Sequence, residues 1–201
     1  FKEAERVFID IPIGLEDENY TRQADQALRD ELGKDYASSV FNAPIRPAAE
    51  APNYATASMI SFDFTEKKIS MQAWNITPKI MQVDRILRNH PDLQDKVFES
   101  HPELLFKVLN GGQVVEQKKS TNLGLKHRLQ LLRSYMPNAK DLYREIKESE
   151  NSRDVKEDDL LDAMVLAILA KKSLENGLLT IPDNAPKDAQ GLTMAIHYSS
   201  I

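Results

Sequence analysis

The sequence predicts an α/β fold, in which helices flank a sheet that contains parallel strands. Residues 7–15 form a near-continuous apolar run closed by proline and glycine, as expected of a central strand covered on both faces. Residues 21–32 and 77–89 have the start and stop signals of helices. Residues 163–170 are apolar on every side of a helix, which is typical of a helix that packs inside a protein.

Composition indicates one domain over residues 1–201. With 201 residues, 41% of them hydrophobic and no visible linker, the chain can bury a single sizeable core. The absence of cysteine excludes a disulfide framework and a thiolate metal site, and it is compatible with the cytoplasmic location that we expect. A formal charge of −5 argues against indiscriminate binding to long nucleic acid, and no apolar run is long enough to span a membrane.

The remaining elements follow from caps and turn residues. Thr77 and Pro78 predict the start of the helix that ends at residue 89. Arg22, Asp25 and Arg29 share one helix face, where a solvated ladder of ion pairs is expected. The other predicted helices cover residues 54–60, 103–109, 122–135, 141–149 and 157–170, and further strands cover 95–103 and 192–198.

Three carboxylates mark the start of the apolar helix. Asp158 and Asp159 lie in its first turn, where acids complement the helix dipole. Asp162 lies one turn further on and on the apolar side, so its carboxylate is expected to be buried or half-buried. This position predicts a catalytic or metal-binding role for Asp162 with one of its neighbours. A capped, solvated helix start is the alternative.

Two further acids lie toward the carboxyl ends of predicted strands, at the edge where ligands of α/β sheets collect. Asp10 lies toward the carboxyl end of the first strand, and Glu103 lies at the junction of the second strand with the next helix, beside His101. Carboxylates without cysteine suit Mg²⁺ or Mn²⁺, which support phosphodiester hydrolysis. We therefore predict Asp10, Asp159 and Asp162 as metal ligands and Glu103 as a ligand or base. In the alternative, Asp10 accepts bonds from loop amides and His101 is structural.

Basic and aromatic residues, including His101, are the candidates for binding the substrate. Lys118 and Lys119 precede the helix 122–135, whose amino terminus offers free amides to a phosphate. Ser39 and Arg46 lie in a proline-rich loop and suit an anionic group, while Trp74 suits a base or ring. Exposed surface chemistry is the alternative for the lysines and the loop, and helix packing is the alternative for Trp74.

Several of these motifs together resemble a known family. Residues 9–15, 38–41 with Pro44 and Arg46, 72–76, 101–103 and 158–163 resemble the family labelled domain of unknown function four-two-nine, which is described as predicted RNase H-like nucleases. The pattern Asp159-x-x-Asp162-Ala163 also looks like the last-helix motif of Holliday-junction resolvases. The resemblance implies an RNase H-like mixed sheet, with Asp10 as the acid of the fourth strand.

One feature implied by the resemblance is missing from the sequence. RNase H-like folds begin with three antiparallel strands, the first of which carries the central metal-binding aspartate, and residues 1–6 do not supply them. We therefore expect a domain that is incomplete at its N-terminus, with a strand edge that a homodimer would cover.

Three functions are compatible with these residues. The first is a metal-dependent nuclease. The second is a non-catalytic module on the same fold that binds a nucleotide or a protein. The third and weaker one is a phosphotransferase, against which the sequence shows no glycine-rich phosphate loop.

Overall fold

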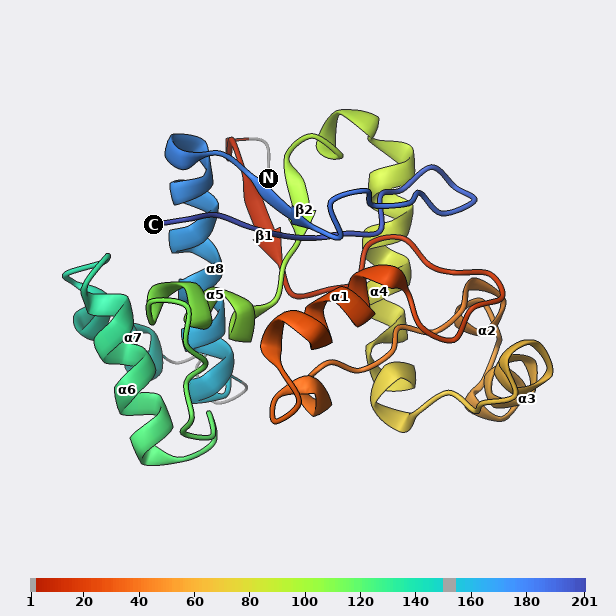
Figure 1. The fold of residues 1–201 in the computed structure, drawn as a ribbon, viewed down its shortest axis with the longest axis horizontal. Helices are drawn as coiled ribbons and strands as arrows, with labels where there is room; N and C mark the ends of the chain where they lie inside the picture. Colours follow the sequence, from red (N-terminus) through yellow and green to blue (C-terminus); the bar gives the residue numbers. More distant parts are fainter. Residues whose placement is uncertain (1–2, 150–154) are drawn as a thin grey trace. The chain divides into compact units, whose positions relative to one another are not determined.

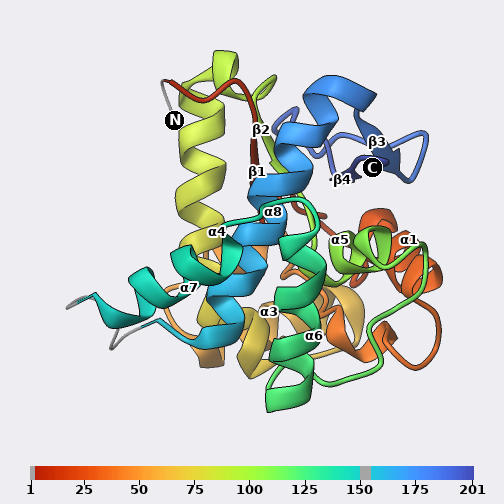
Figure 2. The ribbon, with the colours of Figure 1, turned by 90° about the vertical axis from the view of Figure 1, so that its left-hand side faces the viewer.

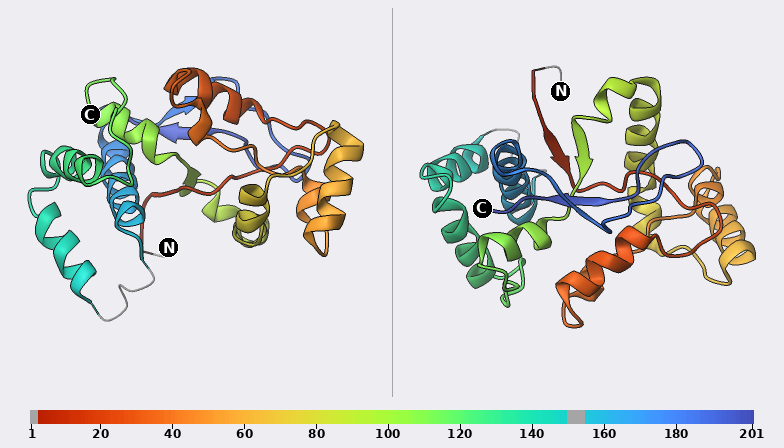
Figure 3. Two further views of the ribbon diagram at one scale, coloured as in Figure 1. Left: turned by 90° about the horizontal axis from the view of Figure 1, so that it is seen from below. Right: turned by 45° about the horizontal axis from the view of Figure 1, so that its top comes forward.

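The protein is described by a computed structural model that covers residues 3–149 and 155–201. These residues form eight α-helices and four short strands (Figure 1). Strand β1 (Val7–Ile9) pairs in parallel with β2 (Val97–Glu99), and β3 (Leu179–Ile181) pairs antiparallel with β4 (Ile196–Tyr198), as Figure 3 shows for the two blue strands. The predicted α/β class is therefore confirmed, although the strands are shorter than the apolar runs suggested.

The chain divides into two compact units, each assembled from segments that are distant in the sequence. The first unit comprises Phe1–Phe8, Ser100–Leu179 and Tyr198–Ile201. The second unit comprises Ile9–Glu99 and Thr180–His197.

The first unit is built around the long helix α8 (Glu157–Asn176). Helices α5 (Pro102–Leu109), α6 (Asn122–Arg133) and α7 (Ala139–Glu148) all pack against α8, and Figure 2 shows α6 and α7 beside it. The core consists of fully buried side chains such as Phe106, Leu132, Leu161, Val165 and Leu169. The predicted burial of α8 is confirmed, except that Ala163 and Ala167 form an exposed strip.

The second unit holds the other four α-helices: α1 (Gln23–Leu32), α2 (Arg46–Ala49), α3 (Tyr54–Thr65) and α4 (Met71–Asn89). Short 3₁₀ turns span Ala37–Ser39 and Pro91–Leu93. Helix α2 packs against both α3 and α4, and the apolar cluster between them contains Ile45, Ala48, Ala57, Ile69 and Ala73.

The start of α4 differs from the sequence prediction. The helix begins at Met71, with the Ser70 hydroxyl accepting a bond from the Ala73 amide at 3.1 Å, so Thr77 is not its cap. Pro78 lies inside the helix, where it removes one backbone hydrogen bond. The helix continues through the proline because Ala73, Thr77 and Ile80 are all buried on one side of it.

The predicted solvated ladder on α1 is also wrong. Arg22 and Asp25 are each only 2% exposed. The Arg22 guanidinium donates to Asp25 Oδ1 at 2.6 Å and to Glu99 Oε1 at 2.6 Å, and also to the carbonyls of Ile13 and Gly14 at 3.1 Å. We call Arg22, Asp25 and Glu99 the buried network. It fixes the turn after β1 to the start of α1.

A glycine is required in that turn. Gly14 has φ +74°, a left-handed conformation that side chains disfavour. A Cβ atom on Gly14 would lie 2.6 Å from Cγ of Met194, so the segment around residue 194 can approach only because no side chain is present. No helix among the described residues is long and apolar enough to cross a membrane.

Candidate functional site

Asp162 lies in the second turn of α8 and is 6% exposed, which confirms its predicted burial. Its Oδ2 atom accepts a bond from Lys119 Nζ at 2.8 Å. Its Oδ1 atom is buried and has no hydrogen-bond partner among the described residues. Asp162 therefore presents one satisfied and one unsatisfied carboxylate oxygen.

A second pair of opposite charges belongs to the same unit. Both oxygens of Glu103, in the first turn of α5, accept bonds from Arg128 Nη2 at 2.8 Å. Arg128 is 1% exposed, donates to the Gln117 carbonyl at 2.8 Å, and lies 5.2 Å from the centre of the Phe106 ring. We call Asp162, Lys119, Glu103 and Arg128 the acid–base cluster.

The electrostatics indicate that all four members of this cluster interact. Burial raises the pKa of Asp162, and the Glu103 charge adds to this rise, while Lys119 and Arg128 oppose it. Burial lowers the pKa of Lys119, but the Asp162 carboxylate, together with the charges of Asp158 and Glu103, outweighs this effect and raises the pKa. The cluster therefore holds Asp162 as a carboxyl whose ionised form is disfavoured, next to a lysine that stays charged.

The loop before α6 places Lys119 in the cluster. Thr121 caps α6 by accepting a bond from the Gly124 amide at 3.1 Å, and its hydroxyl donates to the Lys118 carbonyl at 2.8 Å. A Cβ atom on Gly124 would lie only 2.1 Å from the Lys118 carbonyl oxygen. The loop therefore packs directly on the first turn of α6 because position 124 has no side chain.

The sequence-predicted residues divide between the two units. The first unit brings Glu103, Lys119 and Asp162 together, and it also contains the exposed residues Asp159 and Lys118. His101 lies at the N-cap of α5 and is half-buried.

The second unit contains the other predicted residues. Asp10 and Ser39 are both exposed, and the Ser39 hydroxyl donates to the Tyr36 carbonyl at 2.7 Å. Trp74 packs against Tyr54, with ring centroids 6.2 Å apart. This contact agrees with the packing alternative for Trp74.

Arg46 lies outside the surface loop that was expected for it. It opens helix α2 and is 5% exposed. Its Nη2 atom donates to Asp84 at 2.9 Å and to Asp188 at 2.5 Å. These internal partners give Arg46 a role in holding the second unit together.

Sequence reasoning missed Arg128. The available signal was its position between Leu125 and Leu132, on a face of α6 where spacing of three and four residues predicts burial. A lone arginine on such a face needs a buried acid as its partner. Glu103 is 25 residues away in the sequence, so the pattern could indicate the need for a partner without identifying it.

Among the described residues, no group of three or more His, Asp or Glu side chains is arranged to hold a metal ion. The unsatisfied Oδ1 atom of Asp162 is nevertheless a ligand that a hard cation prefers. Mg²⁺ usually binds proteins through one or two carboxylates and keeps several waters. A single carboxylate such as Asp162 is a ligand of that kind, whereas the described residues form no cage made only of protein ligands.

These features define an α/β protein with a charged cluster at the start of its apolar helix. The chain belongs to the family described as protein of unknown function (DUF429), whose profile matches residues 1–187. Searches of the curated proteins and of the solved structures found no significant match.

Proposed function

We propose that this protein is a metal-dependent nuclease of RNase H-like type, with Asp162 at the centre of its active site. The observation that carries this proposal is the buried Oδ1 atom of Asp162, which has no partner among the described residues. Leaving a buried acceptor unsatisfied costs about 1–3 kcal/mol, so a ligand that binds this oxygen would be favoured. The motif Asp159-x-x-Asp162-Ala163, which resembles the last-helix motif of Holliday-junction resolvases, supports the same assignment.

The cluster suggests a role for each residue. Asp162, with Asp159 one turn before it, would hold Mg²⁺ or Mn²⁺, which when bound activates water and stabilises a leaving oxygen. Lys119 contacts Asp162, and its side chain is 42% exposed, which supports a role in binding a phosphate together with the neighbouring Lys118. Glu103 is bound on both oxygens and therefore acts as a positioning residue for Arg128. The role of Asp10 stays a prediction.

The test is metal binding by the intact chain. We expect Mn²⁺ and Mg²⁺ to raise the melting temperature of the wild type, because the ion binds only the folded state. Asp162→Asn should abolish this gain. Asp141→Asn, which removes an acid that is 72% exposed on α7, is the matched control and should retain it.

Cleavage of labelled DNA, RNA and hybrid duplexes, with and without metal, would then identify the substrate. A wild-type chain whose melting temperature is unaffected by either metal would contradict the nuclease proposal.

A second candidate is a non-catalytic module that binds a nucleotide or a protein. One observation favours it: each acid of the cluster already has a basic partner at 2.8 Å. This function predicts nucleotide binding that survives a chelator and is lost when Lys118 and Lys119 are both replaced by alanine. The oligomeric state in solution tests the proposed homodimer, and the lack of cysteine supports our proposal of a cytoplasmic location.

A further inference from the structure

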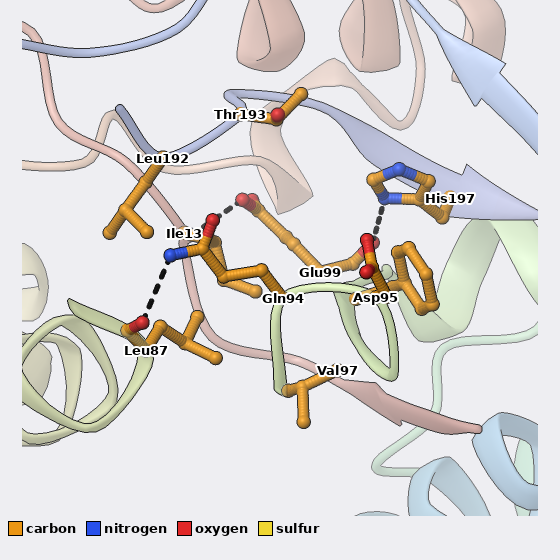
Figure 4. Close-up of a pocket in the computed structure, with 10 residues that line it drawn as sticks. Ile13, Leu87, Gln94, Asp95, Val97, Glu99, Leu192, Thr193 and His197 are labelled. Carbon is orange, nitrogen blue, oxygen red and sulfur yellow. Dashed lines mark hydrogen bonds between the residues drawn. The ribbon is translucent and has the colours of Figure 1, made fainter. Parts of the chain in front are cut away.

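The second unit contains a cavity of about 190 Å³ that the proposed function does not use (Figure 4). Its polar lining comes from Gln94, Asp95, Thr193 and His197, and Leu87 and Leu192 contribute apolar surface. All of these residues belong to the second unit. The cavity is smaller than the roughly 300–1,000 Å³ of sites for drug-sized ligands, so its ligand must be small.

Glu99 also lines this cavity, but its carboxylate is already engaged. Oε1 accepts from Arg22 at 2.6 Å, and Oε2 accepts from Arg22 at 2.9 Å and from the Ile13 amide at 2.6 Å. Because Arg22 also binds Asp25, one guanidinium faces two carboxyl groups. The buried network therefore presents no net positive charge to the cavity.

Two of the groups that are left for a ligand, on Asp95 and Gln94, are hydrogen-bond acceptors. Asp95 is exposed and, among the described residues, its carboxylate has no hydrogen bond or ion pair. Gln94 donates its amide nitrogen to the Leu87 carbonyl at 3.0 Å, which fixes the side chain and leaves the amide oxygen as an acceptor. Among the described residues, no lysine or arginine lines this space.

Aromatic surface adds to this chemistry. The rings of Phe98 and His197 both line the cavity, with centroids 4.8 Å apart and planes inclined by 57°. A nitrogen of the His197 ring, Nδ1, lies 3.2 Å from the Glu99 carbonyl oxygen, a contact that fixes the ring. An aromatic ring attracts a cation placed over its face.

We infer that this cavity binds a small organic cation that carries an ammonium or guanidinium group. The free carboxylate of Asp95, the amide oxygen of Gln94 and the aromatic ring of Phe98 are the groups that recognise such a cation. Phosphate and carboxylate ligands would find no lysine or arginine among the lining residues, and the carboxylates of Asp95 and Glu99 would repel them.

Binding of simple probes to the full chain tests this inference. Methylguanidinium and butylammonium should give saturable shifts of the backbone amide NMR signals of Asp95 and Thr193. Methylurea, a neutral near-isostere of methylguanidinium, and butyrate, the anionic counterpart, should not. Saturable binding of neither cation, or equally strong binding of methylurea or butyrate, would overturn the inference.

Matched variants locate the site. Asp95→Asn should weaken binding of methylguanidinium about fivefold, the effect expected for an exposed charge pair. Asp92→Asn removes an equally exposed acid from the preceding 3₁₀ turn, outside the cavity lining, and should leave binding unchanged. An equal loss in both variants would indicate long-range attraction only and would overturn the assignment to this cavity. Because these residues lie outside the acid–base cluster, the result is independent of the nuclease proposal.

Discussion

The buried network and the acid–base cluster are built from similar residues but differ in how completely their charges are satisfied. In the buried network, Arg22 is 2% exposed and bonds to two carboxylates and two backbone carbonyls. In the acid–base cluster, the Lys119 side chain is 42% exposed, and Asp162 keeps one buried oxygen without a described partner. We call the first arrangement closed, because its guanidinium and both carboxylates are paired with each other. We call the second arrangement open, because one buried carboxylate oxygen has no partner among the described residues.

The difference indicates what each arrangement contributes. A closed network of charges and hydrogen bonds fixes local structure, because every member would be left unsatisfied by any other conformation. Burial raises the pKa of Glu99 even beside Arg22, so this network is sensitive to the loss of any member. An open cluster keeps the capacity to bind a further group, at some cost in stability.

The largest effect should come from breaking the closed network. Arg22→Met would leave Asp25 and Glu99 buried without their cation and would remove the bonds to Ile13 and Gly14. We expect a loss of about 3–5 kcal/mol in the free energy of unfolding, measured with a chemical denaturant. Arg144→Met, which breaks an ion pair that is 63% and 72% exposed, should change stability by less than about 1 kcal/mol. Similar losses in the two variants would remove the contrast between closed and exposed charges.

An intermediate effect should come from displacing the loop that carries Lys119. In an ordinary helix, Gly→Ala stabilises by about 1 kcal/mol. In α6 the new Cβ of Gly124→Ala would lie 2.1 Å from the Lys118 carbonyl oxygen, so the loop must move. We expect the sign to reverse, with a loss of about 1–3 kcal/mol, as for other overpacked positions.

Two further measurements complete the test of Gly124. In Gly124→Ala, the shifted loop should carry Lys119 away from Asp162. The pKa of the Asp162 carboxyl, measured by NMR, should therefore be higher in this variant than in the wild type. Leu123→Ala, at a neighbouring helix position that is 71% exposed, is the control and should change stability by about 0.5 kcal/mol or less. A stabilising Gly124→Ala would show that the loop does not depend on this close approach.

The same contrast explains what could be predicted from the sequence. The helices were predictable because their caps, glycines and apolar spacing are local signals, and the burial of Asp162 followed from its place on the apolar side of α8. The burial of Arg22 was not predictable, because spacing of three residues is the same in a solvated ladder and in a buried pair. The deciding partner, Glu99, is 77 residues away. The pairing of Lys119 with Asp162, 43 residues apart, was hidden for the same reason. The single domain and the metal ligands stay predictions.

The smallest effect should appear as a difference in pH dependence at the open cluster. Burial raises the pKa of Asp162 in the folded protein, whereas the unfolded chain has the ordinary value of about 3.9. Between these two values the folded state binds more protons than the unfolded state, so this group makes stability fall as pH rises through the window. Asp162→Asn should remove that contribution. The free energy of unfolding of the variant, minus that of the wild type, should therefore increase from about pH 4 upward and then level off.

Denaturation of the wild type and D162N across this pH range measures that difference directly, and the contributions of Glu99 and the other carboxyls cancel in it. Each unit of pKa shift corresponds to about 1.4 kcal/mol, which sets the scale of the change. If D162N instead loses stability relative to the wild type as pH rises, Lys119 stabilises the Asp162 carboxylate more than burial destabilises it. The acid–base cluster would then be as closed as the network around Arg22, and the unsatisfied Oδ1 atom would no longer indicate a ligand.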